Sequence, residues 1–175
     1  MKKNFPKTFT LIGILSLLSV LATVVNIGSA SSGQAVERPF RMQTYGVVVD
    51  EGPNLGNCPF VTVLAEGEGN ATHMGLVSIN RTHCFDPTAD TPISDGYWEA
   101  VAANGDKIWG SYEGTLVPTD FNDKGEPIRG RIDSPYTIDG GTGRFEGASG
   151  SGVTTADYDL VEDAGHFVTE GVITY

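Results

Sequence analysis

Cysteine, histidine and basic residues are scarce in this sequence, and each shortage excludes a class of function. The chain has 2 cysteines, 3 histidines and 11 lysines and arginines, against 22 aspartates and glutamates. Nucleic-acid binding depends on clustered lysine and arginine side chains that meet phosphates, so we expect no nucleic-acid partner. Binding to anionic membrane surfaces is disfavoured for the same reason. The acidic residues are spread along the chain, which favours solubility.

Helical periodicity is also missing after residue 31. No window of about a dozen residues repeats apolar side chains at three- and four-residue spacing without an interrupting glycine or proline. What remains is a series of short segments separated by turn residues, which is typical of β-strands. We expect eight strands, at 42–49, 60–66, 74–80, 96–103, 107–116, 130–138, 152–160 and 166–174.

The first thirty residues have the three parts of a signal peptide. Lys2, Lys3 and Lys7 open the chain, an apolar stretch follows to Ile27, and Gly28-Ser29-Ala30 supplies small residues for cleavage. A retained membrane anchor is the alternative, which the polar residues inside the apolar stretch disfavour. We therefore expect a signal peptide at 1–30, a flexible lead-in at 31–41 and a β-barrel domain at 42–175.

Cleavage would produce a strongly acidic protein in the periplasm or the extracellular medium. Loss of the three lysines leaves 8 basic and 22 acidic residues, a net charge of −14. Cys58 and Cys84 are the only cysteines, and an oxidising compartment favours a disulfide between them. Such a bridge closes a loop of 27 residues and stabilises the fold by about 3.5 kcal/mol in the chain-entropy account. A free reactive thiol or a metal ligand is the alternative.

The segment 140–150, GGTGRFEGASG, is the most distinctive stretch of the sequence. Glycine lets a chain turn sharply and approach its neighbours closely, so we expect a corner here that lets a curved sheet seal. Eight antiparallel strands with glycine bends favour a closed barrel, and a β-sandwich is the alternative. The residues of this structural motif are Gly140, Gly141, Thr142, Gly143, Arg144, Phe145, Gly147 and Gly150.

This glycine segment resembles the signature of the allene oxide cyclase-like barrel superfamily, which includes the plant dirigent proteins. Bacterial exported members are also similar at Ala103-Asn104-Gly105-Asp106. Independently, Asn-Gly between two strand-like runs predicts a two-residue hairpin turn. The resemblance implies an eight-stranded antiparallel barrel with an apolar lumen, often in a homodimer or homotrimer. Plant members guide cyclisation or radical coupling of an apolar substrate, chiefly by shape.

Catalytic and cofactor motifs are absent from the sequence. Residues 147–152 lack the glycine spacing of a nucleophile elbow, and no dinucleotide pattern precedes a helix. Zinc needs three or four converging ligands, so for His73, His83 and His166 we expect structural or surface roles. We expect no cofactor and no metal.

Aromatic side chains provide the positive indication of a ligand site. Candidate ligand-binding residues are Tyr45, Trp98, Trp109 and Tyr112. The segment 107–116 alternates between a face with two glycines and Tyr112, which would leave room for a cavity, and a face with Glu113. If the second face points inward, Glu113 becomes a buried acid with a raised pKa. We prefer the interpretation that these aromatics simply fill a small barrel.

Two functional hypotheses follow. The leading one is an exported, non-catalytic barrel that binds a small apolar ligand or serves as a structural module. The alternative is a cyclase or isomerase that folds an apolar substrate in the lumen, assisted by Glu113 or Glu99. The second hypothesis requires an acid that points into an open lumen.

Overall fold

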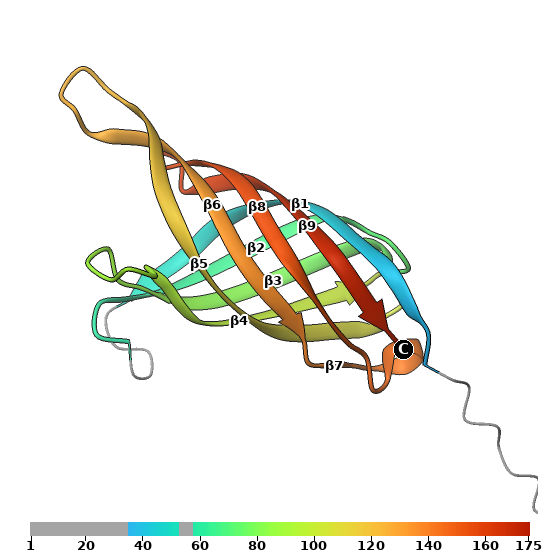
Figure 1. Cartoon of the computed structure of the whole chain (residues 1–175). Coiled ribbons are helices and arrows are strands. Elements are labelled where there is room, and N and C mark those ends of the chain that lie inside the picture. The colour runs from blue at the N-terminus through green and yellow to red at the C-terminus, as the bar shows by residue number, and fades with distance from the viewer. Residues whose placement is uncertain (1–34, 53–57) are drawn as a thin grey trace, which may run out of the picture. The chain divides into compact units, whose positions relative to one another are not determined.

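The computed structural model describes residues 35–52 and 58–175, which form one closed antiparallel sheet (Figure 1). Strand order is β4-β3-β2-β1-β9-β8-β6-β5-β7, and β4 also pairs with β5. That ladder joins both ends of the sheet, so the predicted eight-stranded antiparallel barrel is confirmed, with the short β7 as an addition. The expected signal peptide at 1–30 lies outside the described residues.

Each segment expected from the sequence coincides with a strand, four of them overrun it by one residue (60, 74, 103 and 160), and most strands are longer than expected. They are β1 (Glu37–Gly52), β2 (Val61–Ala71), β3 (Gly75–Phe85), β4 (Ile93–Ala102), β5 (Lys107–Phe121), β6 (Pro127–Ile138), β7 (Gly140–Gly141), β8 (Ser149–Asp159) and β9 (Ala164–Thr174). Residues 37–41 of the expected lead-in belong to β1, because Glu37 already pairs with Thr174 of β9. The β5–β6 hairpin extends beyond the barrel wall (Figure 1).

Side chains alternate between the lumen and the outer surface, as strand geometry requires. The larger buried cluster occupies one half of the lumen, and its fully buried members include Phe40, Ile108, Phe145 and Ile173. A smaller buried cluster, Ile93, Ile132 and Ala156, lies in the other half. The unfilled volume of the lumen therefore lies mainly beside this smaller cluster.

The glycine segment 140–150 closes one end of the barrel. β7 pairs with β5, and a 3₁₀ turn, η1 (Gly143–Phe145), buries Phe145 completely. Gly143 has φ +61°, and Arg144 forms an ion pair of 3.6 Å with Asp106. The two stretches that carry the family resemblance therefore lie together. The wall itself is sealed by the β4–β5 ladder, so the segment caps the cylinder and does not seal it.

Four residues, 103–106, connect β4 to β5, and the hydrogen bonds enclose a three-residue turn at 103–105, where the sequence predicted a two-residue turn. Ala102 donates its N–H to the carbonyl of Asp106 at 2.8 Å, and Gly105 donates to the carbonyl of Ala102 at 2.9 Å. Gly105 has φ +89°, whereas Asn104 keeps a negative φ. A single left-handed residue after a turn is the geometry of a three-residue hairpin loop.

Cys58 and Cys84 form a disulfide, with their Cα atoms 5.3 Å apart. The bond ties the residues just before β2 to the end of β3. A disulfide is compatible with an oxidising compartment. In the described ranges, no helix is long and apolar enough to cross a membrane.

Candidate ligand-binding site

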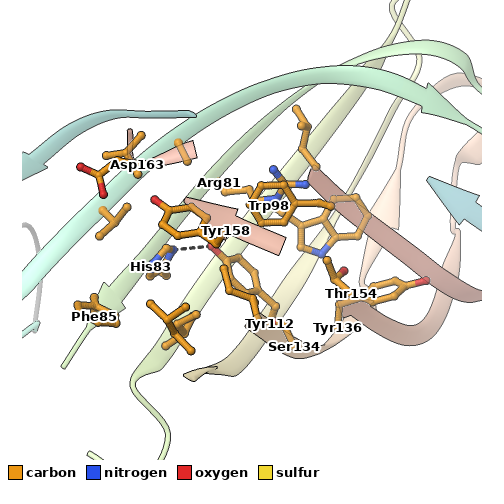
Figure 2. Close-up of a pocket in the computed structure, with 18 of the residues that line it drawn as sticks. Arg81, His83, Phe85, Trp98, Tyr112, Ser134, Tyr136, Thr154, Tyr158 and Asp163 are labelled. Atoms are coloured by element: carbon orange, nitrogen blue, oxygen red, sulfur yellow. Dashed lines mark hydrogen bonds between the residues drawn. The ribbon is translucent and has the colours of Figure 1, made fainter. Parts of the chain in front are cut away.

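A cavity of about 160 Å³ occupies the half of the lumen that is not packed solid (Figure 2). Most of its lining is apolar, with side chains contributed from all around the barrel, among them Met42, Ile79, Trp98, Leu116 and Phe167. Glycines on the lumen face make room for the larger side chains. A Cβ at Gly96, for example, would overlap the ring of Tyr112. The cavity therefore depends on small residues opposite large ones.

Arg81 of β3 projects into this apolar cavity. Its Nη2 donates a hydrogen bond of 3.1 Å to Oγ1 of Thr44, and its guanidinium carbon lies 4.4 Å from the ring centre of Phe167. The side chain is partly accessible because the cavity reaches it, but Nη1 is enclosed and has no hydrogen-bond partner in the part of the chain that the structure describes. Burial lowers the pKa of Arg81 to about 10, so the guanidinium stays charged at neutral pH.

His83 lies two residues further along the same face of β3. Its Nδ1 and the hydroxyl of Tyr112 are joined by a hydrogen bond of 2.8 Å (Figure 2). Burial, and then the charge of Arg81, lower the pKa of His83 to about 4. Burial raises the pKa of Tyr112, with a smaller opposing effect of Arg81. Both rings are therefore neutral at pH 7, beside a permanent positive charge.

Further polar groups line the cavity without adding charge. Thr154 and Thr169 bond to each other at 2.9 Å, and Ser134 donates to the carbonyl of Glu113. The hydroxyl of Tyr136 is buried and has no partner among residues 35–52 and 58–175. Burial raises the pKa of Tyr136 to about 12. This hydroxyl is a second polar group whose hydrogen-bonding capacity is unused.

Two carboxylates, Glu51 and Asp163, also line the cavity. Asp163 lies in the β8–β9 turn, where its carbonyl accepts a hydrogen bond of 2.9 Å from the N–H of Val48. Burial raises the pKa of Tyr158, and the negative charges of Asp163 and Glu51 raise it further. Neither forms an ion pair with Arg81 in the described part of the chain. The turn end of the cavity is thus acidic, while the interior carries the positive charge.

The candidate residues from the sequence divide between the two faces of the wall. Trp98 and Tyr112 line the cavity, whereas Tyr45 and Trp109 do not. Tyr45 is half exposed, with its ring centre 5.0 Å from that of His166 in a tilted arrangement, and the ring of Trp109 lies against Gly140.

The two candidate acids are outside the lumen. Glu113 is exposed on the face of β5 that points away from the cavity, while the face with the two glycines and Tyr112 points inward. Glu99 forms an ion pair of 3.0 Å with Lys107 on the outer surface. These positions disfavour both carboxylates as participants in chemistry inside the barrel.

Arg81 and His83 were not among the candidates, although the sequence contains a signal for them. Val77, Ile79, Arg81, His83 and Phe85 alternate with polar residues, so they share one face of a strand. An arginine and a histidine on an otherwise apolar face indicate a polar group inside the barrel. His73 and His166 lie apart from the cavity, and no three potential metal ligands gather among the described residues.

Comparison of the chain with models of protein families, with curated proteins and with solved structures gives no significant match.

Proposed function

We propose that this protein is an exported barrel that binds a small, mainly apolar ligand in its lumen. The observation that carries the proposal is the cavity of about 160 Å³, lined largely by apolar side chains, in a barrel whose other half is filled. An engineered apolar cavity of about 150 Å³ admits benzene. The lumen therefore suits a ligand with a body of about one ring or a short alkyl chain.

Export is supported by two features. The first residues have the pattern of a signal peptide, and Cys58 and Cys84 are bonded, which is compatible with an oxidising compartment. A closed eight-stranded barrel is also the fold that the resemblance to the allene oxide cyclase-like superfamily implies. We include membership of that superfamily in the proposal. The non-catalytic form of the hypothesis is favoured because Glu99 and Glu113 face outward.

A cavity-filling variant tests lumen binding. Titration calorimetry with 1-octanol, a neutral apolar probe, should show binding to the unmodified protein. Ala65→Phe places a ring in the cavity, because Ala65 lines it, and should abolish the binding. Thr82→Phe adds the same ring on the exposed outer face of β3 and should leave it intact. Equal binding by both variants, or no binding by the unmodified protein, would contradict the proposal.

One observation favours an isomerase as the second candidate. The hydrogen-bonded His83 and Tyr112 place a neutral base and a proton donor beside the cavity, and general acid–base catalysis requires such a pair within reach of the substrate. Conversion of cyclohex-3-en-1-one to its conjugated isomer, followed by ultraviolet absorbance, tests this activity. Acceleration that disappears in Tyr112→Phe would support it, and a rate equal to that in buffer would exclude it for this substrate class.

A further inference from the structure

We infer that the ligand is a small apolar monocarboxylate, whose carboxylate pairs with Arg81 while its hydrocarbon body fills the cavity. The inference rests on the proposed lumen binding and adds the chemical class of the ligand. Three features of the cavity carry it: the unused donors of Arg81, the neutral groups beside them, and the acidic side chains elsewhere in the lining.

The first feature is the unused hydrogen-bonding capacity of Arg81. A guanidinium has five N–H donors in a planar fork that matches a carboxylate. Nη2 donates to Thr44, but Nη1 is enclosed without a partner in the described ranges. No described carboxylate forms an ion pair with Arg81. Burial of an uncompensated charge is costly, and an anion brought by a ligand would compensate it.

The second feature is the composition of the groups around the guanidinium. Phe167 packs on its face at 4.4 Å, and Trp98 lines the same region (Figure 2). Tyr112 and His83 are neutral at pH 7 and can share hydrogen bonds with an anion without repelling it. The site thus offers a single positive charge with apolar walls. One positive charge balances one carboxylate, whereas a phosphate dianion would leave a net negative charge in the apolar lumen.

The third feature is the position of the acidic residues in the lining. Glu51 and Asp163 disfavour an anionic group in their part of the cavity. The charges of Asp163 and Glu51 act on the hydroxyl of Tyr158, whereas the charge of Arg81 acts on His83 and Tyr112. A ligand with one carboxylate can place it at Arg81 and present only hydrocarbon to the acidic end. A dicarboxylate of the same length would meet like charge there, so the lumen should select monocarboxylates.

Titration calorimetry at pH 7 with a matched ligand series tests the inference. The protein used is the mature chain, without residues 1–30. Octanoate should bind at least tenfold more tightly than 1-octanol, because one charge-assisted hydrogen bond is worth a tenfold change or more. Octanedioate, octylamine and acetate should each bind at least tenfold more weakly than octanoate. Octanoate binding no tighter than octanol would overturn the inference and leave the lumen proposal standing. Absence of binding by every probe would overturn both.

Variants of Arg81 locate the carboxylate. Arg81→Met keeps the length of the side chain and removes the charge, so octanoate affinity should fall at least tenfold while octanol affinity stays unchanged. Arg81→Lys keeps the charge without the planar fork and should give an intermediate affinity for octanoate. Arg41→Met, on the exposed outer face, is the matched control and should bind as the unmodified protein does.

Unchanged octanoate affinity in folded Arg81→Met or Arg81→Lys would overturn the inference. If Arg81→Met does not fold, the Arg81→Lys variant and the ligand series decide the question.

Discussion

Arg81 places a charge among mostly apolar side chains inside the barrel. The guanidinium is surrounded by apolar side chains, with Thr44 and Phe167 as its close partners. Desolvation of a charge costs several kcal/mol, and one hydrogen bond with one aromatic contact offsets only part of that cost. A residue that reduces stability at a cavity is a good candidate for a binding role, because the ligand would supply the missing interaction.

Replacement of Arg81 by methionine should therefore stabilise the protein. We expect Arg81→Met to raise the free energy of unfolding by about 1 to 2 kcal/mol, as apolar replacements of buried charged groups do. Urea denaturation of the disulfide-bonded protein measures this change, with Arg41→Met as the exposed control. A loss of 2 kcal/mol or more in folded Arg81→Met would show that Arg81 is a structural member of the core.

His83 should make stability depend on pH. Its pKa falls from 6.5 to about 4 on folding, so between these values the unfolded chain takes up a proton that the folded protein does not. The free energy of unfolding should therefore decrease by about 2 kcal/mol from pH 7 to pH 5 through this residue alone. This contribution of His83 to the free energy of unfolding is present above pH 6.5 and is lost as the pH falls toward 4.

Denaturation curves at pH 7 and pH 5 check this expectation by comparing variants. His83→Gln should lack this part of the pH dependence, whereas His166→Gln, which alters an exposed histidine on the outer face, should keep it. An identical pH dependence in unmodified protein and His83→Gln would show that the imidazole is not desolvated in the folded state.

At the scale of elements, the glycine segment and the β4–β5 turn form one structural unit. Thr142 accepts a hydrogen bond of 3.0 Å on its hydroxyl from the N–H of Lys107, and its own N–H donates at 2.9 Å to the carbonyl of Lys107. Arg144 pairs with Asp106, and Phe145 fills the end of the core. The unit holds the closed end of the barrel, which leaves the opposite half free to contain the cavity.

A pair of glycine variants separates backbone strain from close contact in this unit. Gly143 and Gly147 have φ of +61° and +75°, so alanine at either position should cost about 1 kcal/mol in backbone strain. Only at Gly143 would the added Cβ overlap the carboxylate of Asp106. Gly143→Ala should therefore be less stable than Gly147→Ala by a further 1 kcal/mol or more, measured by thermal unfolding. Equal stabilities would mean that the carboxylate of Asp106 rotates away without cost.

Much of the fold could be predicted from the sequence, because each strand shows its own alternation. The lengths of the strands could not be predicted, because a strand continues for as long as its neighbour offers backbone hydrogen bonds. Residues 37–41 show this, because they are in a strand only through pairing with β9. β5 passes its expected end at residue 116 for the same reason, since it runs to Phe121 along β6.

The cavity was harder to predict than the barrel. Alternation tells which side chains share a face but not which face is inside, and this left Glu113 and Tyr112 as competing inward residues. On β3, the charge of Arg81 by itself predicts that its face of the strand points outward, whereas Ile79 on the same face predicts that it points inward. Only the closed ladder of eight strands, with Ile79 buried and Arg81 beside it, decides between them.

At the scale of the whole molecule, the described part of a strongly acidic chain encloses the positive charge of Arg81. The net charge of the complete chain is −11, so long-range electrostatics oppose the approach of an anion, and increasingly so at low salt. The proposed selectivity for an apolar monocarboxylate would therefore have to come from contacts inside the lumen, where Arg81 lies beside apolar side chains.

The most direct measurement is isotope-edited NMR of octanoate bound to the protein with labelled methyl groups. The account predicts nuclear Overhauser effects from the alkyl chain to the lumen methyls of Ile79, Leu116 and Ile132, all of which line the cavity. Effects confined to exposed methyls such as those of Val153, with none to the lumen methyls, would contradict it.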